Sequence, residues 1–280
     1  MILCKALGKS FDTKEEMFKE LKSNKKEIIE LKKSQIQKSC EKGASVIARA
    51  IPVSKLQDNN KALKLDDNFY YIAVNSTRIL DSHDDLHKDG LWEITVKARQ
   101  GKNYLVEDHV LSIKTTVTKK QYVEMFTAMI PFSMIGKSYD GNTQVLIYKV
   151  PKDKIISKES KEWLESGDEI EASVRMQYVK IALAMNSADS DDAEEKEIYD
   201  ANIDLIANKD DFEDIFFFWV VSEAKNIMES SLVLFGSNNS TGQILNIDTK
   251  AAEQALLNSK KEADEQSLQS KKTIINILKN

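Results

Sequence analysis

Acid–base chemistry in this chain depends on few side chains, because only three histidines are present: His83, His87 and His109. A nucleophilic hydroxyl needs a base of suitable pKa within hydrogen-bond reach, and histidine is the usual base. His109 lies in YLVEDHV, after a short apolar stretch and two acids. It is either a general base or a histidine at a strand end that makes a structural hydrogen bond.

Two further polar residues stand in stretches that are otherwise mainly apolar. Ser173 lies in SVRMQYVKIALAMN and Glu229 in IMESSLVLF. With His109 they have the residue types of a serine hydrolase, in which a hydroxyl attacks, an imidazole moves the proton and a carboxylate orients the imidazole. No GxSxG elbow surrounds Ser173, and Glu229 is equally compatible with a polar residue at a sheet edge. The residue types therefore permit this chemistry without selecting these three.

A different chemistry is suggested by HDDLH, in which His83 and His87 lie four residues apart. This spacing resembles HExxH, which places two zinc ligands on one helical face. Asp84 occupies the position of the glutamate that acts as general base, the surrounding residues favour turns, and no obvious third ligand follows. A solvated polar loop is the favoured interpretation, and a metallopeptidase is the alternative. We expect neither a metal nor a cofactor, since the nucleotide-binding patterns GxxxxGK(S/T) and GxGxxG are also absent from the sequence.

Composition indicates a soluble intracellular protein with a sizeable core. Of 280 residues, 41% are hydrophobic and 30% are charged, and the net charge of -5 gives no reason to expect direct nucleic-acid binding. Cys4 and Cys40 form no CxxC pair, which argues against a disulfide framework or a cysteine-based zinc site. The longest apolar run, IFFFWVV at 215–221, is too short to span a bilayer, so no membrane association is expected.

The order of elements indicates an α+β fold with a β-rich centre and charged helices at both ends. Residues 1–42 are expected to form an N-terminal helical arm, 43–236 the β-rich domain, and 237–280 a linker followed by a charged C-terminal helix. Within the first segment, residues 12–38 are rich in Lys and Glu, lack Gly and Pro, and place apolar residues roughly on one helical face. This helix either lies along the body of the protein or serves as an arm for assembly.

Shorter patterns predict the elements of the centre. Alternating or β-branched residues predict strands at 68–74, 144–150, 170–185 and 215–222, and a helix closed by Gly167 is expected at 157–166. Weaker patterns favour strands at 92–98 and 110–118 and a helix at 119–127. Ser173 is thereby placed inside a long strand.

Several stretches resemble the prohead (capsid maturation) proteases of tailed phages, particularly a form found in phages of the Bacteroidetes group. They are FKELKSNKKEIIELKKSQ, NSTRILDSHDDLHKDGLW, YLVEDHV, YDGNTQVLIY, SVRMQYVKIALAMN and FFFWVVSEAKNIMESSLVLFGSN, spread from about residue 18 to residue 239. The resemblance implies a β-barrel-like core with surrounding helices, similar to the herpesvirus assembly protease. It also implies a serine endopeptidase that works in the host cytoplasm inside the immature capsid, where it cuts the scaffold, capsid-protein extensions and usually itself.

The resemblance also selects a triad. The family's histidine segment matches YLVEDHV and selects His109 as the base. Its nucleophile segment, a serine between hydrophobic residues and glycines, matches EASVR and selects Ser173. Its late segment, E-x-S before a hydrophobic strand, matches ESSLVLFGSN and selects Glu229 as the third member. The major capsid protein and the scaffold are the implied partners, together with further copies of the chain.

The chain departs from the family pattern at the nucleophile and in the late segment. Glu171 and Arg175 replace the glycines on either side of the serine, and the expected proline of the late segment is absent, with Gly236 near its place. These replacements favour a second hypothesis, a catalytically degenerate capsid assembly or scaffolding protein. Arg175 itself either assists an oxyanion hole or forms a salt bridge.

Overall fold

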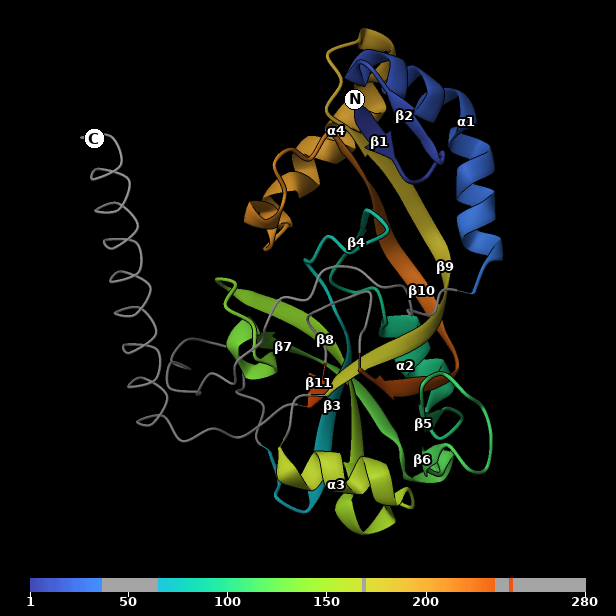
Figure 1. Ribbon diagram of the computed structural model, residues 1–280, viewed down its shortest axis with the longest axis vertical. Coiled ribbons are helices and arrows are strands. Elements are labelled where there is room, and N and C mark those ends of the chain that lie inside the picture. Colours follow the sequence, from blue (N-terminus) through green and yellow to red (C-terminus); the bar gives the residue numbers. More distant parts are fainter. Residues whose placement is uncertain (37–64, 168–169, 235–241, 244–280) are drawn as a thin grey trace, which may run out of the picture.

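Two long antiparallel strands, β9 (Glu171–Met185) and β10 (Phe217–Val233), run through much of the molecule and connect its parts (Figure 1). The computed structural model describes residues 1–36, 65–167, 170–234 and 242–243. Most of the segment 237–280, expected to form a linker and a charged helix, lies outside these residues. The strands expected at 170–185 and 215–222 are confirmed, and the second one continues well beyond its expected end.

The strands of the described residues form three sheets. One contains β4 (Asp85–His87), β10, β5 (Tyr104–Glu107) and β6 (Thr116–Thr118) in that order, with β9 also paired to β10. A second contains β11 (Gly242–Gln243), β3 (Phe69–Ser76), β8 (Asn142–Pro151) and β7 (Glu124–Pro131). The third is a hairpin of β1 (Ile2–Cys4) and β2 (Lys9–Phe11). Among the described residues none of these sheets closes into a barrel, and together with the helices they make a mixed α+β structure.

The helices pack on these sheets, and the largest apolar cluster lies between the two larger sheets. The α-helices are α1 (Lys14–Ser34), α2 (Glu93–Arg99), α3 (Lys158–Ser166) and α4 (Ala193–Asn202). In the described part of the chain, no helix is long and apolar enough to cross a membrane. The cluster takes Ile72 and Tyr148 from one sheet and Leu105, Val174 and Leu232 from the other. It therefore fixes β5, β9 and β10, which carry the candidate residues, against a common core.

The N-terminal helix α1 lies along the body of the protein, which was one of the two alternatives for it; the other was an arm for assembly. Its N-cap is Thr13, whose Oγ1 accepts a hydrogen bond from the backbone N–H of Glu16 at 3.2 Å. Its apolar face is buried against the ends of β9 and β10, where Phe18 and Leu21 join a cluster with Trp219. Figure 1 shows α1 beside the upper half of β9. The helix is therefore a structural part of the body in this chain.

Ion pairs add to this apolar contact. Lys22 and Lys25 both reach the buried carboxylate of Glu195 on α4, at 2.6 and 2.5 Å. The two cations lower the pKa of that carboxyl against the opposing effect of its burial. Near the other end of α1, Lys32 contacts the buried carboxylate of Asp85 at 2.5 Å. The positive charges of this Lys-rich helix thus compensate acids of the body.

Three of the weaker expectations are wrong, and in each case the surrounding structure accounts for the difference. Residues 92–98 are largely the helix α2, although Ile94, Thr95 and Val96 favour a strand, because tertiary packing overrides propensity. The hydroxyl of Thr95 bonds to the carbonyl of Ala224 on β10 at 3.0 Å, which ties the helix to that strand.

The other two wrong expectations concern the segments around β6 and β7. Most of 110–118 is a loop, in which Thr115 and Thr116 hydroxyls bond backbone carbonyls, so only β6 remains of the expected strand. The expected helix at 119–127 is instead a short 3₁₀ turn followed by β7, which pairs with β8 from Glu124 to Pro131. The strands at 68–74 and 144–150 and the helix at 157–166 are confirmed as β3, β8 and α3.

If α1 is part of the body, truncating its buried face must destabilise the whole protein. Leu21→Ala removes a side chain with no exposed surface, so we expect the free energy of unfolding to fall by about 2–4 kcal/mol. Urea denaturation followed by circular dichroism measures this change. Leu31→Ala on the same helix is the matched control, because Leu31 is 53% exposed and its truncation should change stability little. Equal effects of both variants would contradict the docked position of α1.

Candidate active site

Ser173 lies on the central strand pair, at a position where three strands run side by side. In the antiparallel pairing of β9 with β10, Ser173 stands opposite Ser231, and on the other side of β10 Ser231 stands beside Val106 of β5. Directly opposed residues of an antiparallel pair project from the same face of the sheet. The side chains of Ser173 and Ser231 therefore share one face, and both residues are buried.

His109 is held over this face by its backbone. It follows the end of β5, and its N–H donates to Ser231 Oγ at 2.9 Å, while the N–H of Asp108 donates to the carbonyl of Leu232 at 3.0 Å. Asp108 and His109 have φ angles of 49° and 56°, in the left-handed region that costs a non-glycine residue about 1 kcal/mol. Two consecutive left-handed residues turn the chain back onto the sheet, and the bonds to β10 stabilise that turn.

Glu229 completes a buried pair with this histidine. Its Oε1 and Oε2 atoms lie 3.0 and 3.2 Å from His109 Nδ1, and Glu229 has no exposed surface. A carboxylate can only accept in this contact, so Nδ1 donates, and in the tautomer that this requires of a neutral ring Nε2 has a lone pair. Glu229 precedes Ser231 by two residues on the same strand, which places both side chains on the same face. Glu229 thus orients the ring while Ser231 holds the backbone.

The second ring nitrogen of His109 is the unusual atom of this arrangement. Nε2 is buried and makes no hydrogen bond to any group in the described residues, Ser173 included. Buried polar atoms are nearly always paired, and an unpaired one in a native structure calls for an explanation. A ring nitrogen with a lone pair is the atom that a general base presents to a hydroxyl. Hydrogen bonds of this kind are often long in a protein without substrate and shorten when substrate binds. The nearest link to Ser173 is Ser231, which stands opposite it and binds the backbone N–H of His109.

Glu171 and Arg175, which stand where the resemblance to prohead proteases would place glycines, are placed without backbone strain. Glu171 and Arg175 are both strand residues of β9, and neither is among the described residues with positive φ. Glu171 lies 3.9 Å from Lys137 in an ion pair. No ion pair of the described residues includes Arg175, and its buried Nε atom makes no hydrogen bond there. Of the two alternatives for Arg175, the salt bridge is therefore not found among the described residues, and the backbone requires a glycine at neither position.

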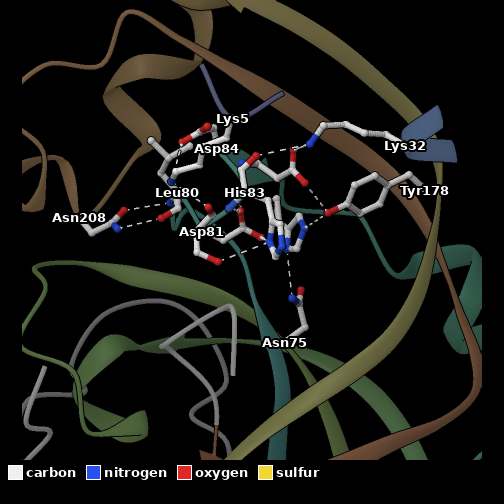
Figure 2. A network of polar contacts seen from close by, with 12 residues as sticks. Lys5, Lys32, Asn75, Leu80, Asp81, His83, Asp84, Tyr178 and Asn208 are labelled. Carbon is white, nitrogen blue, oxygen red and sulfur yellow. Dashed lines mark hydrogen bonds and ion pairs between the residues drawn. The ribbon is translucent and has the colours of Figure 1, made fainter. Parts of the chain in front are cut away.

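The other two histidines belong to a separate polar network around β4, seen in Figure 2. His87 is buried, with Nδ1 3.0 Å from Asn75 Nδ2 and Nε2 3.4 Å from the hydroxyl of Tyr178. That hydroxyl donates to Asp85 at 2.8 Å, and Asp85 contacts Lys32. Both nitrogens of His87 are therefore occupied by protein groups, in contrast to His109.

The interpretation of HDDLH as a solvated loop is wrong, because Asp85 and His87 are only 1% exposed and form β4. Nor do they present a zinc site, since the segment is not helical and the described residues contain no group of three or more His, Cys, Asp or Glu placed to hold a metal ion. Burial raises the pKa of Asp81 and of Asp85, and the ammonium of Lys32 opposes this at Asp85. Burial also lowers the pKa of His87 to about 4. The network is a structural one.

Two residues that support the buried pair of His109 and Glu229, called the dyad below, were not predicted from the sequence. The sequence signal for Ser231 is its i, i+2 spacing from Glu229, which places both side chains on the same face of a strand. The only sequence signal for Asn226, three residues before Glu229, is a single amide in a mostly apolar strand, and that residue is fully buried.

The lowered pKa of His87 makes stability depend on pH with a defined sign. In the unfolded chain the ring gains a proton near pH 6.5, while the folded ring stays neutral until about pH 4. Protonation therefore favours the unfolded state as pH falls through this window, by at most about 3 kcal/mol. We expect the stability advantage of the wild type over His87→Gln to shrink between pH 7 and pH 4, measured by urea denaturation. Parallel pH curves for the two proteins would contradict the neutral, buried state of His87.

Comparisons with known proteins leave the dyad to be interpreted from its own geometry. No family model, curated protein or solved structure matches the chain.

Proposed function

We propose that this chain is a serine endopeptidase in which Ser173 is the nucleophile, His109 the general base and Glu229 the residue that orients the imidazole. The observation that carries the proposal is the buried contact of Glu229 with His109 Nδ1 and the unpaired Nε2 of the same ring, whose backbone N–H binds the Ser231 that stands opposite Ser173. Nucleophile, base and acid come from three neighbouring strands or their ends. Triads are defined by this geometry and by no particular order along the chain.

The chemical steps assign one role to each residue. Ser173 Oγ attacks the scissile carbonyl of a peptide, and His109 Nε2 takes the hydroxyl proton and then delivers it to the leaving amine. Glu229 stabilises the imidazolium that exists between these steps. Water then attacks the acyl-enzyme, with His109 again accepting and returning the proton, which releases the product acid and restores Ser173.

Stabilisation of the oxyanion falls to groups of β9 and its surroundings. Arg175 follows Ser173 by two residues on a regular strand, so its side chain leaves the same face. Its Nε is buried and unpaired within the described residues, and an N–H donor of a cation in a buried site favours developing negative charge strongly. Backbone N–H groups near the nucleophile are the usual further donors.

The proposed substrates and surroundings follow from the resemblance to prohead proteases. The substrates are the scaffold and extensions of the major capsid protein, cut inside an immature capsid in the host cytoplasm, and the enzyme assembles there with further copies of itself. The same proposal includes a barrel-like arrangement of the core. It is supported by β9, which pairs with β10 in one sheet and also contacts β3 and β11 of the other.

A catalytically degenerate assembly protein is the second candidate, and three observations bear on it. The unpaired Nε2 of His109 fits a site in which the imidazole activates no nucleophile. Against it, a carboxylate is kept fully buried beside His109, which an assembly role does not require, and Glu171 and Arg175 fit the backbone without strain. The first candidate therefore accounts for more of the buried chemistry.

Replacement of the nucleophile separates the two candidates. On co-expression with the cognate capsid protein, wild type is expected to process capsid protein or scaffold, and Ser173→Ala to reduce processing by about 10³-fold or more. Mass spectrometry of the products measures this, and His109→Ala should have a similar effect. Ser187→Ala is the matched control, because Ser187 is 7% exposed against 6% for Ser173 and lies near the far end of β9.

Full processing by Ser173→Ala would rule out the assignment of the nucleophile. Normal capsid assembly without any cleavage by wild type would instead favour the degenerate assembly protein. Circular dichroism spectra of the variants show whether a loss of processing comes from misfolding.

A further inference from the structure

We propose that Asn226 is a positioning residue of the site. It holds an excursion of β10, the three residues 227–229 that are not paired with β9. This excursion separates Glu229 from Ser173 by the width of the imidazole ring. The inference rests on the proposed function, because it assigns the spacing of that triad to one buried amide. Its first support is the register of the two long strands.

Pairing of β9 and β10 shifts by two residues just before Glu229. Asn226 stands opposite Met176, but the next paired residue, Ser230, stands opposite Val174. Three residues of β10, 227–229, thus span the place of the single residue Arg175 on β9. Uninterrupted pairing from Asn226 would have put Glu229 opposite Ser173. The shift puts Ser231 there instead and moves Glu229 along the strand by two residues, which is about 7 Å.

This displacement provides the space in which His109 sits. A triad needs the ring between the hydroxyl and the carboxylate, because each of them uses a different nitrogen. A carboxylate directly opposite Ser173 leaves no room for that ring. The excursion is strained at Met228, which has a φ of 68°, in the left-handed region. A conformation of this kind persists only where surrounding contacts hold it.

Asn226, the last residue of β10 that pairs with β9 before the excursion, supplies those contacts. Its Nδ2 donates to the carbonyl oxygen of Glu229 at 2.9 Å and to Ser230 Oγ at 3.2 Å, and reaches the carbonyl oxygen of Arg175 at 3.4 Å. The amide of Asn226 therefore ties the two ends of the excursion together and binds them to β9. Carbonyl oxygens only accept, so the orientation of the amide is determined.

The amide is itself held by its other atoms. The hydroxyl of Tyr148 donates to Asn226 Oδ1 at 2.6 Å, and the backbone N–H of Asn226 donates to Thr95 Oγ1 at 3.2 Å. Asn103 donates to the hydroxyl of Tyr148 at 3.3 Å and to the carbonyl oxygen of Asn226 at 3.4 Å. All four residues are at most 2% exposed. This buried network connects α2, β8 and the segment before β5 to the backbone of Glu229.

The test uses Asn226→Leu, which keeps the volume of the side chain and removes its hydrogen bonds. We expect kcat for cleavage of a capsid-derived peptide to fall about 10²-fold with little change in KM, because the ring is misplaced while substrate binding remains. We also expect the nitrogen-15 NMR signals of His109 to change from the Nδ1–H form to a mixture of both ring tautomers. With three histidines in the chain, these signals can be assigned by single substitutions.

Asn208→Leu is the matched control. Asn208 is also a buried asparagine, whose amide bonds to the backbone N–H and carbonyl of Leu80 at 2.9 and 3.0 Å, away from the dyad. It should lose a similar amount of stability and leave both kcat and the His109 signals unchanged. Tyr148→Phe, which removes the donor to Asn226 Oδ1 and the acceptor of the Asn103 amide, should show the same two changes at smaller amplitude and serves if Asn226→Leu does not fold.

The two readouts separate this proposal from the proposed function. If wild type cleaves nothing, the protease assignment fails, and the tautomer signals still decide whether Asn226 positions Glu229. A folded Asn226→Leu protein with wild-type His109 signals overturns the inference, as does an unchanged Tyr148→Phe protein where Asn226→Leu is unfolded. Equal loss of kcat in Asn208→Leu also overturns it, because the effect then follows stability alone.

Discussion

The antiparallel ladder of β9 and β10 is the constraint on which the rest of the structure depends. It joins the end of the molecule that holds α1 and α4 to the end that holds the candidate site, and it contributes strands to three of the apolar clusters. Because side chains alternate along a strand, a slip of one residue would turn Ser173 and Ser231 away from His109. The pairing of β9 with β10 shifts by two residues near Glu229. An even shift leaves each side chain on the same face of the sheet and changes only which residues stand opposite each other. The ladder therefore sets both the face and the spacing of the site.

Buried charge imposes the second constraint. A lone carboxylate inside a protein is strongly unfavourable, and removing one member of a buried pair is more costly than the pair itself is worth. The contact with His109 compensates the burial of the Glu229 carboxylate, and contacts with Lys32 and Tyr178 compensate that of Asp85. The two buried histidines differ in one respect, since both nitrogens of His87 are engaged and one nitrogen of His109 is not. That difference is what the proposed role of His109 as a general base requires.

Much of the fold was predictable from local patterns, and the spacing within the site was not. The long strand of Ser173, the helix closed by Gly167 and the amphipathic face of α1 all follow from periodicity or capping residues. The helix α2 was missed because its β-branched residues favour a strand and only packing on β10 decides otherwise. Burial of Asp85 and His87 was missed because their compensating partners, Lys32 and Tyr178, are distant in the chain. The two-residue shift before Glu229 depends on hydrogen bonds of Asn226 with residues far away in the sequence, which no local pattern contains.

Backbone strain is concentrated around the dyad. Of the five non-glycine residues with positive φ in the described part of the chain, Asp108, His109 and Met228 border the contact of His109 with Glu229. Glycine at these positions would relieve the strain but would also increase the freedom of the unfolded and the folded backbone. With a side chain present, each strained residue is held by neighbouring bonds, from Ser231 on one side and from Asn226 on the other. Because the hydrogen bonds and the strain act on the same short segments, the imidazole and the carboxylate are held in register before any substrate is bound. Such preorganisation is what a proton-transferring pair requires, and a structural ion pair has no need of it.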